Sequence, residues 1–403
     1  MAIFNSNDIY PVSADSELPF AQHRDMFHLA GIDQEETILI LYPSSKDSKT
    51  REILFIRRSD EHTKIWEGDK LSKDLASKLS GIESIHFVED FKNILHLITS
   101  KVDTFYINKN EHYRANSPVE TREDRFISWL LKKYPAHKVA KSNPILQRLR
   151  SIKHIDEIDQ IRKACQITKK GFNRVLKFIK PDVWEYQIEA EFIHEFINNS
   201  SKGFAYSPII ASGQDNNVLH YVKNNKQCKD GELILMDVGA EYGNYSSDMT
   251  RTIPVSGHFS KRQKEIYNTV LRVKNEATKL LTVGNNWKNF HDQVGEIMTK
   301  ELLDINLLDK ADIKNQTKKN PAYKKYFMHG TSHHLGLDTH DYGLLDDLFQ
   351  ENMVFTVEPG IYIPEEGFGV RLEDDVVIQT KGEPINLMED IPIETDHIEE
   401  LMN

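Results

Sequence analysis

Residues 232–255 read ELILMDVGAEYGNYSSDMTRTIPV, and this stretch decides the fold of the second half of the chain. The apolar run at 232–238 predicts a buried strand, and 245–255 predicts the strand that returns beside it. Residues 239–243 contain two glycines and supply the turn. The stretch therefore predicts a β-hairpin.

Each strand of this hairpin carries one aspartate in apolar surroundings, Asp237 and Asp248. A hairpin folded about Tyr242 and Gly243 places the two aspartates directly opposite each other. Like charges in such a pair destabilise a sheet, and apolar neighbours screen them poorly. We therefore expect a positive group between the two carboxylates.

A similar pattern recurs near the C-terminus. The apolar run at 353–357 (MVFTV) ends in Glu358 and is stopped by Pro359-Gly360, and residues 370–378 (VRLEDDVVI) predict a strand that carries Glu373. Arg371 precedes Glu373 by two positions, so both point to one face of that strand. A second ladder therefore also delivers two acids.

Four histidines lie between the two ladders, in residues 328–343 (MHGTSHHLGLDTHDYG): His329, His333, His334 and His340. One imidazole with several carboxylates is a ligand set for divalent transition metals, and its oxygen-rich composition favours Mn²⁺, Fe²⁺, Co²⁺ or Zn²⁺. Four carboxylates suit two ions, which can hold a bridging hydroxide and clamp a tetrahedral intermediate. Any one of these residues alone is more typical of a turn, a cap or a packed side chain; the joint order of acid, acid, histidine, acid, acid indicates the site.

Length and composition bound the class of protein. A chain of 403 residues suggests two or three domains, and the net charge of −11 argues against a nucleic-acid binder. Cys165 and Cys228 are too few for a disulfide framework or a cysteine zinc site, and we expect both to be reduced and buried. No run is long and apolar enough to span a membrane and no secretory signal is visible, so we expect a cytoplasmic protein.

The first part of the chain alternates between strands and helices. Strands are predicted at 37–42, 53–56, 84–88 and 104–107, with helices at 70–79 and 90–99. No glycine-rich phosphate loop follows these strands, so this layer is not a dinucleotide-binding domain. We place a domain boundary near 143–154, which divides the chain into 1–150 (α/β) and 151–403, an α+β chain overall.

Helices are predicted from Asp156 to Pro181 and at 185–197. The segment 309–325 carries six lysines, and we expect a solvated surface insertion there, the alternative being a functional basic arm.

The motifs resemble a known family, the dinuclear metallopeptidases of the pita-bread fold. The strings that carry this resemblance are MDVGAEYGNYSSDMTRTIPV, HGTSHHLGLDTHD, VFTVEPGIYIP and VRLEDDVVI. In the first domain, SNDIYP, MFHLAGI and LFIRRSDEHTKIWEG, with KHIDEIDQIRKA after it, are similar to aminopeptidase P, the Xaa-Pro aminopeptidases. The resemblance spans nearly the whole chain. It implies a creatinase/prolidase-like N-terminal domain, a pita-bread catalytic domain and release of the residue that precedes a proline.

The resemblance also implies a ligand set. Asp237 would chelate one metal through both oxygens, Asp248 and Glu373 would bridge two ions (most commonly Mn²⁺), and His333 and Glu358 would complete the second. Glu358 would also act as a proton shuttle, because it could take a proton from the water that bridges the two ions.

Further roles follow from the same resemblance. His220 would lie near the scissile nitrogen, His340 would face the carbonyl oxygen, and His329 would line the proline pocket. Arg371 would orient the carboxylates, and Tyr362 would lie near the metals.

Trp66 matches a tryptophan that reaches a neighbouring subunit's site, so a homodimer or homotetramer is expected, unless Trp66 packs within its own domain. Arg150 is a further candidate on the substrate side. His334 stands where the family often has an aromatic residue, so it is either an additional ligand or a packed neighbour.

Two other functions stay open. Prolidase, which cuts Xaa-Pro dipeptides, uses the same metal set, although the N-terminal strings favour the aminopeptidase. A pita-bread domain can also serve as a non-catalytic protein-binding module, but such domains have usually lost ligands, and all five ligand types are present here.

Overall fold

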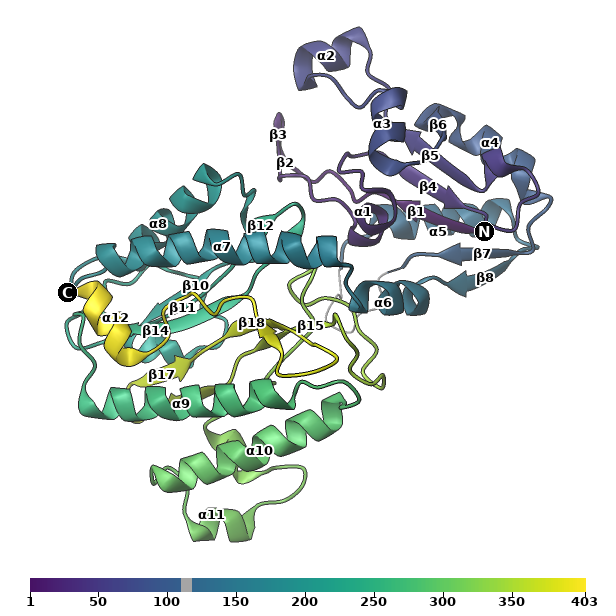
Figure 1. Cartoon of the computed structure of the whole chain (residues 1–403). Helices are drawn as coiled ribbons and strands as arrows, with labels where there is room; N and C mark the ends of the chain where they lie inside the picture. Colours follow the sequence, from purple (N-terminus) through teal and green to yellow (C-terminus); the bar gives the residue numbers. More distant parts are fainter. Residues whose placement is uncertain (110–117) are drawn as a thin grey trace. The chain divides into compact units, whose positions relative to one another are not determined.

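The computed structural model describes residues 1–109 and 118–403 and divides the chain into two compact units, Met1–Gln147 and Arg148–Asn403 (Figure 1). Both cysteines are buried and free, as predicted. Within the described residues, no helix combines the length and the apolar character needed to cross a membrane.

A six-stranded mixed sheet forms the centre of the first unit. All four strands predicted from apolar runs are present in this sheet. It also contains two strands, β1 and β8, that the sequence analysis did not predict. In spatial order the strands are β6 (Ser84–Phe87), β5 (Glu52–Ile56), β4 (Ile38–Leu41), β1 (Ala2–Asn5), β7 (Thr104–Ile107) and β8 (Lys138–Lys141).

Both faces of this sheet are covered. Ile3 and Phe4 follow each other on β1 and are both buried, yet they belong to different core clusters, because successive side chains of a strand point to opposite faces. Two buried faces explain why the strands are apolar runs rather than alternating patterns. The remaining elements of this unit are α1 (Arg24–Ala30), α2 (Glu61–Glu67), α3 (Lys73–Ser80), α4 (Phe91–Thr99), α5 (Arg122–Lys133), β2 (Pro11–Ser13) and β3 (Ser16–Glu17).

The second unit holds several small sheets between two helical layers, with α7 and α8 on one side and α9 and α10 on the other (Figure 1). Its strands are β9 (Gly203–Phe204), β10 (Ile209–Ser212), β11 (Leu233–Val238), β12 (Ala240–Tyr242), β13 (Tyr245–Ser246), β14 (Met249–Pro254), β15 (Val354–Val357), β16 (Gly360–Ile363), β17 (Phe368–Arg371), β18 (Asp374–Val377) and β19 (Ile385–Asn386). Its helices are α7 (Ile155–Phe178), α8 (Glu185–Asn198), α9 (Lys261–Leu280), α10 (Trp287–Asp304), α11 (Lys310–Asn315) and α12 (Thr395–Met402), and α6 (Asn143–Ser151) precedes them.

The two helices predicted after the domain boundary are α7 and α8, and they pack closely. Gly171 on α7 makes this possible, because a Cβ there would lie 2.7 Å from the ring of Phe192 on α8. Helix α8 contacts β10, the neighbour of the strand that carries Asp237, and α7 contacts β12 and β13.

The predicted register of the first hairpin is wrong, because the turn lies one residue later in the chain than expected. Asp237 pairs with Thr250, not with Asp248, and Tyr242 pairs with Tyr245. The turn residues are Gly243 and Asn244, both left-handed (φ 58° and 69°), as two-residue hairpin turns with the right twist require. Asp248 consequently lies just before β14 rather than inside it.

The ladder of this hairpin is interrupted beside its aspartates. The β11–β14 ladder ends at Val238 and Met249, and pairing resumes in β12 and β13. A Cβ on Gly239 would lie 1.8 Å from the carbonyl oxygen of Ser247. Only glycine therefore allows these two backbone segments to approach each other this closely. The interruption lets Asp248 leave the plane of the sheet.

The second hairpin has the same interruption. The strand predicted at 370–378 is in fact two strands, β17 and β18, because the chain changes sheet between Arg371 and Asp374. Its partner also breaks, between β15 and β16. Glu358 and Glu373 both lie in this break, with the Pro359 carbonyl accepting a bond from the Leu372 amide (3.3 Å).

Candidate metal centre

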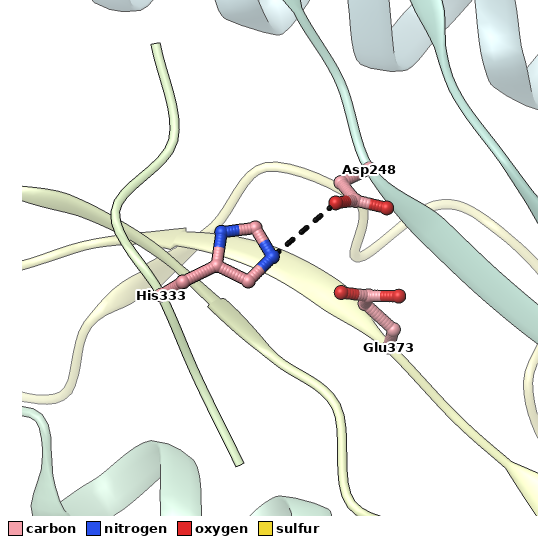
Figure 2. Close-up of side chains that lie close together, drawn as sticks. All are labelled: Asp248, His333 and Glu373. Atoms are coloured by element: carbon pink, nitrogen blue, oxygen red, sulfur yellow. Dashed lines mark ion pairs between the residues drawn. The ribbon is translucent and has the colours of Figure 1, made fainter. Parts of the chain in front are cut away.

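Three side chains from distant segments meet in the second unit: Asp248, His333 and Glu373. Each offers a ligand atom, and these atoms all lie within 4.8 Å of one another. Figure 2 shows the imidazole and the two carboxylates turned toward a common point. His333 Nε2 is 3.5 Å from Asp248 Oδ2 and 3.7 Å from Glu358 Oε1.

The orientation of His333 suits a metal ligand. Its Nδ1 lies 2.9 Å from the carbonyl oxygen of His334 and donates to it, which leaves Nε2 facing the carboxylates. Burial opposes protonation of this imidazole, but Asp248 and Glu358 outweigh burial and raise its pKa to about 9. The site therefore draws a positive charge to the position of Nε2.

The acids of the cluster crowd one another. Burial raises the pKa of Glu358 to about 7, although His333 and Arg371 act against it. Burial and the negative charges of Asp248 and Glu358 raise the pKa of Glu373 well above its usual range. A divalent cation would offset both the burial of these carboxylates and their repulsion, so the donor set fits the expected metals.

Asp237 is held by protein donors. Its Oδ1 accepts from the Tyr206 hydroxyl at 2.7 Å and its Oδ2 from Arg371 Nη2 at 2.6 Å. The same hydroxyl lies 2.6 Å from Asp248 Oδ1, so Tyr206 links the two aspartates of the first hairpin. Burial raises the pKa of Asp237, against the effect of Arg371. The sequence analysis missed Tyr206, because a tyrosine in a loop has no local signal.

A chain of hydrogen bonds runs from Arg371 to His329. Arg371 Nη1 donates to the Tyr362 hydroxyl (2.9 Å), which lies 2.8 Å from His329 Nε2. Burial and the charge of Arg371 lower the pKa of His329 to about 3, so its ring is neutral. Its Nδ1 lies 2.8 Å from the Gly330 carbonyl oxygen and donates there, so Nε2 accepts from Tyr362.

Other predicted residues lie around this cluster at different depths. The His340 ring stacks on His333, with centroids 4.1 Å apart. His220 is exposed, and its charge contributes, after burial and Arg371, to the lowered pKa of His329. His334 is instead buried against Phe355 (centroids 4.5 Å apart) and lies outside the three-residue cluster.

Two further candidates are described separately from the cluster. Trp66 is 75% exposed on α2 of the first unit. Arg150 is buried, donates to Asp338 (2.7 Å) and also binds Asp341.

The acidic run at 373–375 is not a solvated charge run, because all three side chains are buried. Asp374 accepts from Arg251 at 2.6 Å and also pairs with Lys274. Asp375 Oδ2 accepts from the backbone amide of Asp248 at 3.0 Å, so it holds one acid of the first hairpin from the second.

Glu185 is a second residue that the sequence analysis missed. It is fully buried at the start of α8 and accepts from the amide and hydroxyl of Ser212 (both 2.8 Å), the Tyr221 hydroxyl (2.9 Å) and the Lys226 amide (2.9 Å). These bonds fix both ends of the segment that carries His220. In the sequence, an acid at a helix start indicates only a favourable helix dipole.

The chain is similar to known proteins over nearly its whole length. Residues 159–380 match Metallopeptidase family M24, and residues 1–106 match the aminopeptidase P N-terminal domain. Xaa-Pro aminopeptidase from Escherichia coli is 32% identical, covering 97% of this chain and 90% of the relative. Human Xaa-Pro aminopeptidase 3 is also 32% identical, covering 98% of this chain and 79% of the relative.

Solved structures agree with this assignment. Proline aminopeptidase P II from Yersinia pestis superposes with a TM-score of 0.89 at 31% identity, covering 100% of this chain and 94% of that one. Zinc-substituted Escherichia coli aminopeptidase P in complex with product gives 0.88 at 30%, covering 100% and 93%. The predicted fold, an aminopeptidase P N-terminal domain followed by a pita-bread catalytic domain, is confirmed. The chain belongs to metallopeptidase family M24, among its aminopeptidase P members.

Proposed function

We propose that this chain is a metal-dependent aminopeptidase that releases the N-terminal residue from peptides with proline in the second position. The observation that carries this proposal is the meeting of Asp248, His333 and Glu373, in a chain that is similar over its full length to Xaa-Pro aminopeptidases. A prolidase would use the same cluster, but the relatives named above favour the aminopeptidase.

Two divalent ions would be held by Asp237, Asp248, His333, Glu358 and Glu373, with Mn²⁺ the expected metal because of the oxygen-rich donor set. When bound, such ions supply a hydroxide nucleophile at neutral pH and stabilise the negative charge that develops on the attacked carbonyl oxygen. The buried, mutually repelling carboxylates support this assignment.

The chain's own residues would handle the protons. A proline imide nitrogen carries no hydrogen, so its departure depends on protonation as the tetrahedral species collapses. Glu358, whose Oε1 lies 3.7 Å from His333 Nε2, would take a proton from water and return it to the departing nitrogen. His220 would then lie on the side of the leaving nitrogen and His340 on the side of the carbonyl oxygen.

Two groups would position the substrate and the ligands. Arg371, bound to Asp237, would hold the carboxylates in place. His329 and Tyr362, joined by a hydrogen bond, would form the wall of the proline pocket, and burial and the charge of Arg371 keep the His329 ring neutral.

The finer organisation is also a proposal. We assign residues 1–150 to the N-terminal domain and 151–403 to the catalytic domain, supported by the family matches at 1–106 and 159–380. A homodimer or homotetramer is supported by the exposed Ile65 and Trp66 on α2. A cytoplasmic location is supported by two free thiols.

The test is turnover of a matched peptide panel: Ala-Pro-Ala, Ala-Ala-Ala and the dipeptide Ala-Pro, each with Mn²⁺ and with a chelator. We expect metal-dependent release of alanine from Ala-Pro-Ala alone. His333→Ala should abolish this turnover, whereas His397→Ala, a change of an exposed residue on α12, should leave it unchanged. Turnover of only the dipeptide would show a prolidase, and turnover of none by metal-loaded protein would favour a binding module.

A further inference from the structure

A cavity of about 1040 Å³ lies between α10 and residues 316–331. Its walls are tightly fitted. A Cβ on Gly295 of α10 would lie 2.6 Å from the ring of Tyr323, and His291 Cε1 lies 3.8 Å from the Cβ position of Gly330. The cavity is therefore built by close packing of α10 against this segment, and its volume is at the upper end of the range of ligand-binding pockets.

The cavity is strongly basic in an acidic protein. Five lysines and two acids line it, whereas the whole chain carries a net charge of −11. Lys288 pairs with Asp292 at 2.8 Å, but among the described residues no acid lies within 4.0 Å of the four other amino groups. These four lysines are Lys300, Lys318, Lys319 and Lys324.

Two of the cavity's lining residues contact the metal centre. His329 Nδ1 lies 3.6 Å from Glu358 Oε2, and the backbone carbonyl of Thr331 accepts from the Glu358 amide at 2.7 Å. The lysine-rich segment 316–324 thus lies on the same cavity as a residue assigned to the proline pocket. The predicted solvated insertion at 309–325 accordingly lines a cavity over part of its length.

We propose that this cavity binds the part of the peptide that follows the proline, and that its lysines favour substrates with acidic side chains there. This inference rests on the proposed function. A substrate whose N-terminal residue lies at the metals and whose proline lies at His329 must continue beyond His329, and an extended chain advances by about 3.3 Å per residue. Acidic side chains complement the uncompensated lysines, and such complementarity selects between partners.

The experiment compares two amidated peptides, Ala-Pro-Ala-Glu-Glu-Ala and Ala-Pro-Ala-Gln-Gln-Ala, so that side chains supply the only differing carboxylates. Three proteins are assayed, all Mn²⁺-loaded: the native chain, the triple variant Lys318→Gln, Lys319→Gln, Lys324→Gln, and a control triple variant with the same loss of charge. The control changes exposed lysines outside the cavity, Lys310→Gln, Lys314→Gln and Lys381→Gln.

We expect the native protein and the control to prefer the glutamate peptide by about fivefold or more in kcat/KM at low salt, mainly through KM. The cavity variant should lose this preference while its turnover of the glutamine peptide and its Tm stay unchanged, and 0.5 M NaCl should abolish the preference of the native protein and of the control. Equal kcat/KM for the two peptides in the native protein, or equal preference in both triple variants, would overturn the inference and leave the proposed function intact. Failure to cut either peptide would overturn the proposed function and the inference together.

Discussion

The two hairpins of the catalytic unit use the same device with different electrostatics. Each delivers two acids at a point where its ladder is interrupted. In the first hairpin, Asp237 and Asp248 are bound by the Tyr206 hydroxyl. In the second, Thr250 is the side-chain donor to Glu373 among the described residues, at 2.6 Å. Burial raises the pKa of Glu358 to about 7.

The difference is in how many protein donors each pair of acids has. The first pair contacts the Tyr206 hydroxyl and Arg371, whereas Glu373 of the second pair accepts from Thr250. The second pair is buried with less compensation, so its stability depends on protons or metal. Metal binding should therefore affect the second hairpin more strongly.

The largest effect is expected from removing one acid of either hairpin. Asp248→Asn and Glu373→Gln should each lower kcat/KM by on the order of a thousandfold, because each removes a proposed bridging ligand. Steady-state kinetics with metal analysis of the purified variants checks this. Asp390→Asn, an exposed acid, is the control. Near-native turnover in either variant would show that the acid is structural.

Removal of the metal by a chelator should make the unfolding free energy depend on pH, because the second hairpin carries buried acids. The pKa of Glu358 is raised to about 7 and that of His333 to about 9, so the folded protein binds more protons than the unfolded chain. Stability is then fully present at low pH and falls as pH rises from about 5 to 9, by on the order of 3 kcal/mol for Glu358 alone. Denaturation of metal-free protein across this range measures the slope.

Two variants test whether this pH dependence of stability arises from Glu358. Glu358→Gln should flatten it, whereas Asp390→Asn, a change of an exposed acid, should leave it in place. Mn²⁺ should raise the Tm most at the alkaline end, where the ligands are deprotonated. A Tm of metal-free protein that is independent of pH would contradict the contrast between the hairpins.

Loss of the hydroxyl that joins the first pair should have an intermediate effect. Tyr206→Phe removes the donor to Asp237 and Asp248 and should lower metal affinity or activity by about 10- to 100-fold. Metal titration followed by activity assays checks it. Thr250→Val, on β14, removes the donor to Glu373 and is therefore the matched change for an acid of the second hairpin. No change in either variant would mean that these donors do not orient the ligands.

A smaller effect is expected at Glu185, which binds the sheet of the first hairpin from the start of α8. Glu185→Gln replaces one acceptor oxygen by a donor that faces other donors, so it should cost about 1–3 kcal/mol in unfolding free energy. It should also lower kcat by loosening the segment of His220. Glu189→Gln on the same helix, where one bond to Asn224 is at stake, is the control. Equal stability of the two variants would remove the assigned role of Glu185.

The smallest effect concerns the turn that sets the register of the first hairpin. Gly243→Ala places a side chain at φ 58° and should cost about 1 kcal/mol. Asn244→Gly keeps the left-handed conformation and tests the buried side chain instead, whose Oδ1 accepts from Lys202 Nζ at 3.2 Å. Urea denaturation of both variants measures the difference, and an unaffected Gly243→Ala protein would contradict the assigned turn.

Local patterns predicted much of this fold. Apolar runs such as 53–56 became strands, and the helical spacing after residue 156 became α7, because burial on one face or two imposes a period on the sequence. The register of the first hairpin failed by one position, since two neighbouring glycine-containing turns were compatible with the same pattern. The supporting residues Tyr206 and Glu185 could not be predicted, because their partners lie 27 to 42 residues away in the chain.

The sequence by itself determined the order and chemical type of the ligand candidates, the two acid-bearing hairpins and the family. Only the tertiary structure decided which histidine faces the acids and which is packed away, as His333 and His334 are adjacent in the chain yet have pKa values of about 9 and about 3. The physical reason is that side-chain type is local, whereas burial and neighbouring charge, which set orientation and protonation, come from segments that only folding brings together.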